Sequence, residues 1–171
     1  MIQRDLRRGS GAAVRLGYEA AVGFGAKIVV TMDADGQHDP REMHRLVEPL
    51  IAGEADMVQG SRMLGEFEVE SAVRARGVRM FARLISALGG TKITDPSTGY
   101  RAMTTDVLRH LDLRQDQFYV SEMILDATRK NFRVLEVPVS IRRRASGDSK
   151  KPPALRYAWG FSKAIVRTWL R

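Results

Sequence analysis

The sequence has 171 residues, 44% of them hydrophobic, and a formal net charge of +8. A chain of this size and composition can bury one sizeable core, so we expect a single folded unit. It contains no cysteine, which excludes a disulfide framework and a thiolate metal site. No signal peptide or long apolar span is visible, and we therefore expect a cytoplasmic setting. No zinc-finger, homeodomain or aromatic RNA-binding signature accompanies the basic charge, which argues against a nucleic-acid partner.

The most informative motif follows an apolar run at residues 28–32. It consists of Asp33, Asp35, Gly36, Gln37 and His38. The short β-branched run predicts a strand covered on both faces of a parallel sheet, and such sheets bind ligands beyond the carboxyl ends of their strands. Oxygen ligands from carboxylate and amide groups suit Mg²⁺ or Mn²⁺ held together with substrate phosphates. Taken alone, the pair of aspartates is equally compatible with a solvated turn that caps a helix.

A helix is predicted directly after this motif. Asp39, Pro40 and Glu42 have the spacing of a capping box, with Asp39 as the N-cap. Pro49 is expected to kink or weaken the last turn before Gly53 ends the helix. These residues indicate a packed α/β unit.

Two further segments carry arginines near predicted apolar elements. A strand around residues 56–58 leads into Arg62, which is either a phosphate clamp or a surface charge. A helix over residues 72–88 has an apolar core face and, on its opposite side, a stripe containing Arg76, Arg79 and Arg83. The stripe is either solvated or a guide for a lipid phosphate.

Carboxylates follow in the second half of the chain. The loop at residues 94–101 combines turn residues with Asp95, which is a candidate general base or only a turn cap. A helix over residues 121–131 carries Glu122 early, where a carboxylate favours the helix dipole or orients an acceptor hydroxyl. A strand over residues 133–141 is expected to follow.

The positive charge is concentrated at the C-terminus. Residues 142–171 contain nine Lys/Arg and one Asp, which account for the whole net charge. Residues 142–153 read as a basic loop able to contact an anionic ligand. From about Ala154, apolar and basic residues separate onto two helical faces, a pattern typical of an interfacial membrane helix. An ordinary helix docked on the core remains the alternative.

The order of these motifs resembles one family. The matching segments are residues 9–13, 33–40, 60–62, 94–101, 121–122 and 144–150. They resemble the membrane-associated inverting glycosyltransferases of family 2, especially the dolichol- or polyprenyl-phosphate mannosyl- and glucosyltransferases. The resemblance implies a GT-A-like, Rossmann-related α/β fold with a mostly parallel sheet flanked by helices. It places a partial transferase domain at residues 1–151 and an amphipathic, possible membrane-interfacial helix at residues 152–171.

The resemblance also implies roles for particular residues. A UDP- or GDP-hexose donor and a polyprenyl-phosphate acceptor are expected, with Mg²⁺ or Mn²⁺ as cofactor and transfer with inversion at the anomeric carbon. Asp35 and Gln37 resemble the metal ligands, and Asp35, Asp95 and Arg144 the catalytic group. The expected substrate-binding residues are Asp33, Arg62, Arg76, Arg79, Glu122, Ser149 and Lys150.

One departure from the family concerns the first strands. Members begin with a strand that carries an Asn-Glu turn and a second strand that ends in an Asp-Asp-Gly-Ser-like segment, and neither precedes Gly9. The chain therefore reads as an N-terminally truncated transferase on the cytoplasmic face of a membrane. Its exposed sheet edge is expected to invite pairing with another chain, in a homo-oligomer or with a membrane-protein partner. Two alternatives remain: a catalytically silent interaction module, and a basic peripheral membrane protein whose aspartate pair is incidental.

Overall fold

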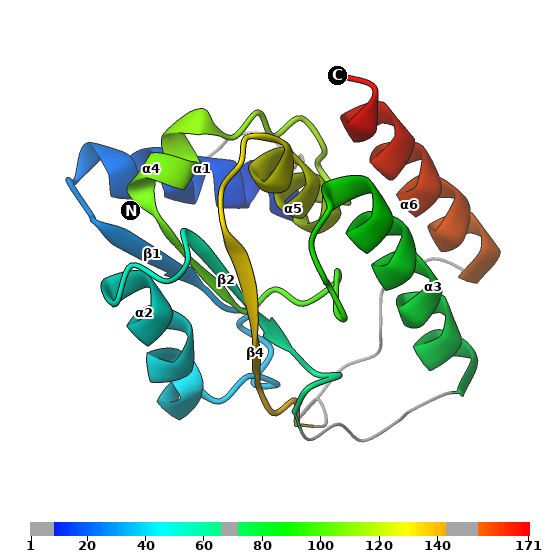
Figure 1. Cartoon of the computed structure of the whole chain (residues 1–171), viewed down its shortest axis with the longest axis horizontal. Helices are drawn as coiled ribbons and strands as arrows, with labels where there is room; N and C mark the ends of the chain where they lie inside the picture. The colour runs from blue at the N-terminus through cyan, green and yellow to red at the C-terminus, as the bar shows by residue number, and fades with distance from the viewer. Residues whose placement is uncertain (1–8, 66–71, 143–153) are drawn as a thin grey trace.

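A computed structural model of the chain describes residues 9–65, 72–142 and 154–171, which form a layered α/β structure (Figure 1). The elements are α1 (Ser10–Gly23), β1 (Ile28–Thr31), the 3₁₀ helix η1 (Pro40–Glu42), α2 (Met43–Ile51), β2 (Met57–Ser61), α3 (Ala72–Gly89), β3 (Arg101–Thr104), α4 (Thr105–His110), α5 (Tyr119–Arg129), β4 (Val134–Pro138) and α6 (Ala154–Trp169).

The strands described form one sheet in the order β1-β3-β2-β4. β3 is antiparallel to both β1 and β2, whereas β2 and β4 are parallel. Three strands therefore run in one direction and β3 runs against them, so the sheet is mixed. The carboxyl ends of β1, β2 and β4 and the beginning of β3 consequently meet at one edge of the sheet.

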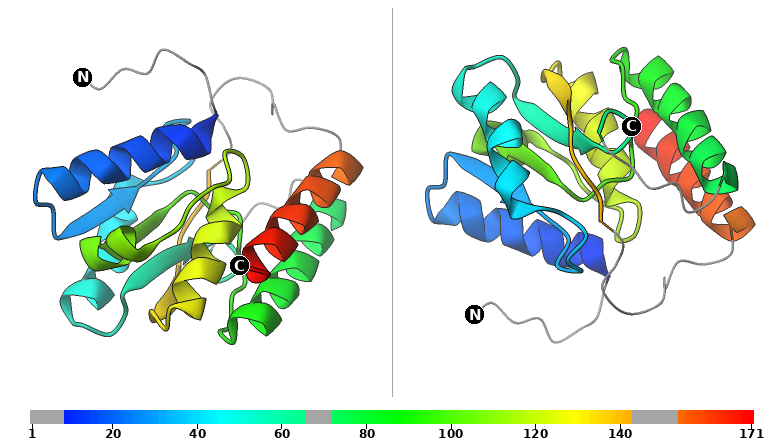
Figure 2. Two further views of the ribbon diagram at one scale, coloured as in Figure 1. Left: turned by 90° about the horizontal axis from the view of Figure 1, so that it is seen from above. Right: turned by 90° about the horizontal axis from the view of Figure 1, so that it is seen from below.

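Alternation along the strands gives the sheet two apolar faces. Met57 and Met103 belong to one core cluster, and their neighbours Val58 and Ala102 to the other. Helix α2 covers the second face, while α1, α3, α5 and α6 supply the larger cluster on the first. The views from above and below show this three-layer arrangement (Figure 2).

Burial differs between the strands. β2 is buried along its whole length, as expected for a strand covered on both faces. The sequence predicts the same for the run that becomes β1, but that prediction is wrong, because β1 is only half-buried. It lies at the end of the strand order and pairs with β3 alone among the strands described.

The start of the predicted helix after residue 39 also differs from expectation. The carboxylate of Asp39 caps η1 by accepting from Arg41 N at 3.0 Å. Glu42 does not complete a capping box, since its carboxylate accepts instead from Ser140 N at 2.8 Å and Ser140 Oγ at 3.1 Å. Glu42 thereby fastens η1 to the chain that follows β4.

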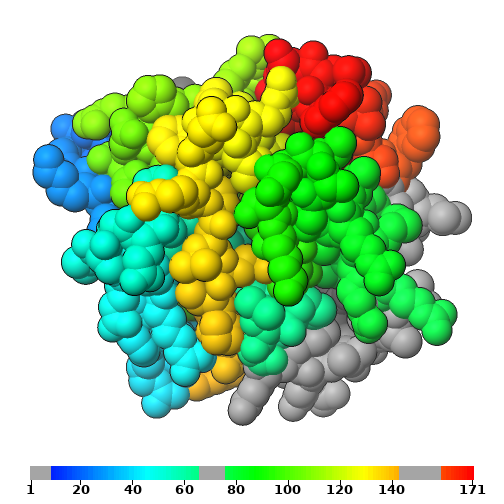
Figure 3. Space-filling view, viewed as in Figure 1, coloured from blue at the N-terminus to red at the C-terminus, as the bar shows by residue number. Residues whose placement is uncertain are grey.

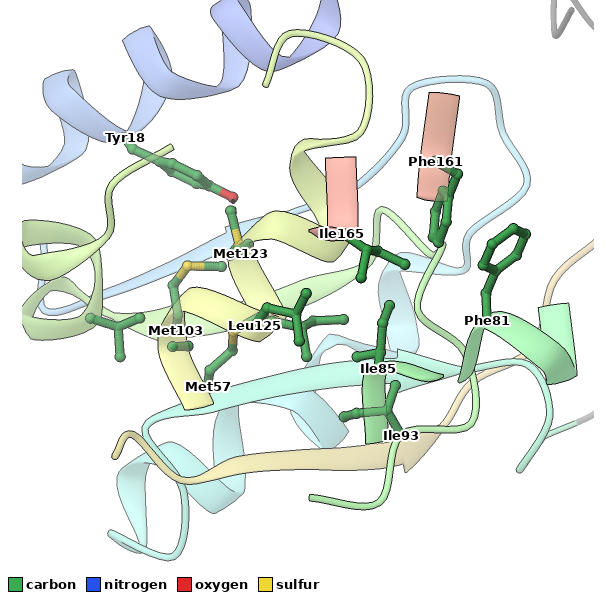
Figure 4. Packing of buried hydrophobic residues seen from close by; sticks show 13 residues of the cluster. Tyr18, Met57, Phe81, Ile85, Ile93, Met103, Met123, Leu125, Phe161 and Ile165 are labelled. Carbon is green, nitrogen blue, oxygen red and sulfur yellow. Dashed lines mark hydrogen bonds between the residues drawn. The ribbon is translucent and has the colours of Figure 1, made fainter. Parts of the chain in front are cut away.

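Helix α6 is docked on the core. Phe161 and Ile165 are buried against α3, and the rings of Phe161 and Phe81 lie 4.3 Å apart (Figure 4). Arg129 Nη1 of α5 donates to the last carbonyls of α6, Thr168 O at 2.8 Å and Trp169 O at 2.6 Å. Within the described residues, no helix has the length and apolar character needed to span a membrane.

Candidate active site

The aspartate motif leaves β1 at the edge where the strand ends meet. Gly36 has a φ of 75°, a left-handed conformation that glycine adopts without the steric cost of a side chain. This turn lets Gln37 N donate to Asp35 Oδ1 at 3.2 Å. Asp35 and Gln37 are both half-buried, and Asp33 is 56% exposed. The turn therefore presents oxygen ligands at the surface rather than inside the core.

The motif is paired with the chain that leaves β4. His38 and Ile141 form an isolated antiparallel bridge. Arg142 N donates to Gln37 O at 2.9 Å, and Gln37 Nε2 donates to Arg142 O at 3.1 Å. Because the amide nitrogen of Gln37 is occupied in this way, its Oε1 is the atom of this side chain able to act as a metal ligand.

Asp39 ties the same two segments together. Hydrogen bonds from Arg41, together with the charges of Arg41 and Arg142, hold the pKa of Asp39 well below its ordinary value. Arg142 Nη2 lies 2.7 Å from Asp39 Oδ2. Asp39 is therefore a cap and an ion-pair partner rather than part of the candidate ligand set.

Asp33 contacts the loop before β3. A Cβ on Gly99 would lie 2.5 Å from Asp33 Oδ1, so a side chain at this position would displace the carboxylate of Asp33. Thr31 Oγ1 donates to Gly99 O at 3.1 Å, and His38 Nε2 lies 3.5 Å from Asp33 Oδ2. The buried ring of His38 also packs against Tyr100. The loop and the aspartate motif are thus interlocked.

Arg62, at the end of β2, forms a two-pronged ion pair with the same loop. Its Nε and Nη2 donate to Asp95 Oδ2 and Oδ1 at 2.6 and 2.7 Å. Asp95 is fully buried, and Ser97 Oγ also donates to it at 3.1 Å. Burial raises the pKa of Asp95, but the hydrogen bonds and charge of Arg62 outweigh this effect and hold it below its ordinary value. An ionised, fully bonded carboxylate of this kind is a poor general base.

Arg101 is the largest fully buried side chain described. Its Nη2 donates to Thr98 O, its Nη1 lies 3.2 Å from the sulfur of Met123, and its guanidinium lies 5.9 Å from the ring centre of Tyr119. Arg101 therefore holds the end of the loop that carries Gly99.

The other predicted residues are dispersed. Glu122 is fully buried and accepts from the amides of Arg114 and Gln115 and from Arg171 Nη1, so its carboxylate is engaged in holding these segments. Arg76 and Arg79 are exposed on α3. Arg144, Ser149 and Lys150 lie outside the described residues.

A divalent cation at this edge of the sheet would need ligands beyond those that Asp35 and Gln37 supply. The residues that the structure describes contain no group of three or more His, Cys, Asp or Glu side chains suited to one metal ion. Asp35 and Gln37 supply oxygen donors of the type that Mg²⁺ and Mn²⁺ accept, and such ions commonly take their remaining ligands from phosphates and water.

Sequence reasoning missed Glu136 and Gln59 as members of the site, and it gave no role of their own to Arg101, within the loop motif, and to Arg142, within the basic loop. Glu136 and Gln59 look like ordinary strand positions, and only pairing between β2 and β4 brings them to the loop. Arg101 was recognisable as the end of the loop motif, but its complete burial follows from the antiparallel strand β3, which the sequence did not predict. The site is thus assembled across strands that are distant in the chain.

Comparisons with known proteins agree with these motifs. The sequence profile of the family described as glycosyl transferase family 2 matches residues 1–112. The chain is 31% identical over 159 residues to polyprenol monophosphomannose synthase of Mycolicibacterium smegmatis, covering 88% of this chain and 58% of that protein. It is 30% identical over 156 residues to undecaprenyl-phosphate mannosyltransferase of Micrococcus luteus, covering 88% and 63%. The chain spans about three fifths of the length of these relatives.

Solved structures show a related fold. Glucosyl-3-phosphoglycerate synthase from Mycobacterium tuberculosis, in complex with Mn²⁺, UDP-glucose and phosphoglyceric acid, aligns with a TM-score of 0.70 at 17% identity. The alignment covers 97% of this chain and 56% of that one. At this identity the likeness concerns the GT-A fold, and it supports the fold expected from the sequence motifs.

Proposed function

Because the chain belongs to glycosyl transferase family 2, we propose that it takes part in metal-dependent transfer of a hexose from a UDP- or GDP-hexose to a polyprenyl or dolichyl phosphate. The observation that carries this proposal is the convergence of Asp33, Asp35, Gln37 and the Arg62–Asp95 pair at one edge of the sheet. Ligands of open α/β sheets bind at such an edge.

The donor half of the site consists of the motif after β1. We assign Asp35 and Gln37 as ligands of Mg²⁺ or Mn²⁺, and Asp33 as a contact to the sugar or ribose of the donor. The cation would neutralise charge that develops on the departing nucleoside diphosphate. The fixed turn at Gly36 and the hydrogen bond from Gln37 to Arg142 O hold these groups in place before any ligand binds.

The acceptor half is cationic. An anionic phosphate oxygen of the polyprenyl phosphate attacks the anomeric carbon as the bond from that carbon to the diphosphate breaks, which gives inversion. Since the nucleophile is already ionised, the step needs no general base, in agreement with the engagement of Asp95 by Arg62. We assign Arg62 as a residue that binds an anionic group of the substrate. We assign Arg76 and Arg79 as residues that attract the lipid phosphate as it approaches the site.

The segment beyond Arg142 completes the proposal. The pairing of Arg142 with Gln37 brings the last described residue before this segment beside the donor half. We retain Arg144, Ser149 and Lys150 as residues that contact the substrate phosphates, and Arg144 as the catalytic member of this group.

A membrane surface is proposed at the α3–α6 side of the molecule. The two helices pack together, and they form the right-hand side of Figure 3. On α6 the outward positions include Trp159, which is 75% exposed, together with Val166, Lys163 and Arg167. Exposed apolar groups beside cationic ones suit binding to the anionic lipids of a cytoplasmic leaflet. The docking of α6 on the core through its other face is compatible with this role.

The first test is titration calorimetry of the chain with a panel of UDP- and GDP-hexoses, with and without Mn²⁺. We expect Mn²⁺-dependent binding of one donor, followed by transfer to a short polyprenyl phosphate. Asp35→Asn should weaken this binding by about tenfold or more, because a metal ligand loses its charge. It should leave the far-UV circular dichroism unchanged.

The matched control is Asp106→Asn, which removes a carboxylate from an exposed position on α4. It should bind the donor as the unaltered chain does. Equal affinities for the Asp35→Asn and unaltered proteins would remove Asp35 from the metal site. A folded chain that binds no donor would favour the interaction module over the transferase.

A further inference from the structure

Glu136 lies in the middle of β4 and belongs to none of the motifs that indicate the proposed function. Its carboxylate accepts three hydrogen bonds from the loop before β3. Oε2 accepts from Thr94 N and Thr94 Oγ1, both at 2.7 Å, and Oε1 accepts from Asp95 N at 2.9 Å. Glu136 thus binds the first two residues of the loop through both of its oxygens.

The loop is held from the neighbouring strand as well. Gln59 of β2 is the register partner of Glu136 in the parallel β2–β4 pair, so the two side chains lie on the same face of the sheet. Gln59 Nε2 donates to Asp95 O, whereas Glu136 accepts from Asp95 N. The backbone N–H and C=O of Asp95 are therefore both hydrogen-bonded to side chains from adjacent strands.

Asp95 in turn holds the side chain of Arg62. The side chain of Asp95 accepts from Arg62 through both carboxylate oxygens, and it also accepts from Arg62 N at 3.2 Å. Bidentate pairs of this kind fix the plane of the guanidinium as well as its position. A displacement of the Asp95 backbone would consequently rotate or release the guanidinium of Arg62.

We propose that Glu136 is a positioning residue, which sets the orientation of the Arg62 guanidinium through the backbone of Thr94 and Asp95. This assignment rests on the hydrogen bonds from Thr94 and Asp95 to Glu136 and from Arg62 to Asp95. Its consequence, that Glu136 tunes the affinity for a phosphate group at Arg62, rests on the proposed function. Burial raises the pKa of Glu136, and the hydrogen bonds from Thr94 and Asp95 oppose this effect by favouring the ionised form.

The test is nuclear magnetic resonance of the whole chain with Glu136→Gln, which keeps the shape of the side chain and replaces one acceptor by a donor. We expect the Arg62 Nε–H signal to shift or broaden, and hydrogen exchange at Thr94 N and Asp95 N to accelerate by about tenfold. The Arg133 Nε–H signal, from an ion pair with Asp56, is the internal reference. Glu48→Gln, at an exposed position on α2, is the matched control and should change none of these signals.

A second variant covers the possibility that Glu136→Gln does not fold. Thr94→Val removes the hydroxyl that donates to Glu136 and keeps the backbone N–H, and Ser61→Ala, which removes the other partner of this hydroxyl, is its control. Thr94→Val should shift the Arg62 signal in the same direction by a smaller amount. If the folded variants of Glu136 and Thr94 leave the Arg62 signal and the two exchange rates unchanged, the assignment is overturned.

The consequence for ligands is measured with a short polyprenyl phosphate. We expect Glu136→Gln to weaken its binding by about tenfold while Mn²⁺-dependent donor binding stays within about twofold, because the hydrogen bonds of Glu136 go to Thr94 and Asp95, whereas Asp35 and Gln37 lie on the segment after β1. Equal phosphate affinities in the presence of a changed Arg62 signal would overturn the effect on the ligand. If the unaltered chain bound no phosphate, the proposed function would fail, and the Arg62 signal would still decide the role of Glu136.

Discussion

Asp33 and Asp95 are two carboxylates of the same region with opposite surroundings. Asp33 is 56% exposed beside Gly99, whereas Asp95 is fully buried and bonded to Arg62. A ligand that approaches the edge of the sheet can therefore reach Asp33, while Asp95 acts through the guanidinium that it holds. Burial and hydrogen bonding, more than residue type, separate the two roles.

We expect Asp95→Asn to lower the free energy of unfolding by about 3 kcal/mol at neutral pH. The substitution leaves the guanidinium of Arg62, whose side chain is 19% exposed, without its counter-charge, and breaking a buried pair on one side is strongly destabilising. Urea denaturation measures this change. A loss of less than about 0.5 kcal/mol would mean that the pair behaves as an exposed surface ion pair.

Gly99→Ala should displace the carboxylate of Asp33. Because the added Cβ would overlap Asp33 Oδ1 and Oδ2, and this exposed carboxylate can rotate away, we expect weaker donor binding with a stability loss below about 1 kcal/mol. Gly77→Ala is the control: its Cβ would meet nothing within 4 Å, and alanine favours the helix by about 1 kcal/mol. Unchanged donor binding by Gly99→Ala would show that the position of Asp33 does not matter.

At the scale of elements, α6 shows the docking on the core that the sequence offered as one alternative, and its membrane role stays a proposal. Its inward residues Phe161, Ala164 and Ile165 pack on the core. Its outward residues Trp159 and Val166 are exposed between basic side chains. The helix is therefore docked on the protein by one face and leaves an amphipathic face available for another surface.

Alanine substitutions on the two faces of α6 should affect different properties: stability on the inward face and vesicle binding on the outward face. Ile165→Ala should cost about 2–5 kcal/mol, because it creates a cavity between α6 and α3. Trp159→Ala should change stability by less than about 0.5 kcal/mol but weaken sedimentation with anionic vesicles. Vesicle binding by Trp159→Ala equal to that of the unaltered chain would argue against the proposed membrane surface.

At the scale of the whole molecule, ion pairs join segments that the chain separates widely. Arg133 pairs with Asp56, Arg142 with Asp39, and Arg62 with Asp95. Hydrogen bonds from Arg133 lower the pKa of Asp56, and hydrogen bonds from Arg41, with a smaller contribution from the charge of Arg142, lower the pKa of Asp39. In Asp95 the contacts with Arg62 outweigh the opposing effect of burial on its pKa. These carboxylates make the fold sensitive to acid.

We therefore expect the melting temperature to fall as the pH drops below about 4, near the ordinary pKa of aspartate. A carboxylate whose pKa is lowered by folding stabilises the fold above its unfolded pKa, and this stabilisation is lost as the pH falls through the folded value. Glu136 has the opposite sign, because burial raises its pKa, so it favours the fold at low pH. Calorimetric melting across this range checks the expectation, and Asp95→Asn should flatten the curve.

Local patterns were sufficient for most elements of the fold. The apolar spacings predicted α2, α3, α5 and α6 to within a few residues, as well as the position of β4. Strand β3 and helix α4 were not predicted, because Arg101–Thr104 is too short for a recognisable alternation. The partial burial of β1 was also not predictable, since burial depends on which strands pair with it.

The sequence by itself determined the family, the α/β class and the residues of the aspartate motif, because these depend on short motifs in a fixed order. Only the tertiary structure decided that Asp95 holds Arg62, that Gln37 is paired with Arg142, and that Glu136 reaches the loop. Each of these contacts joins residues more than thirty positions apart, and the pairing of the strands, together with the packing of the segments that leave them, brings these residues together. No short sequence motif indicates contacts of this kind.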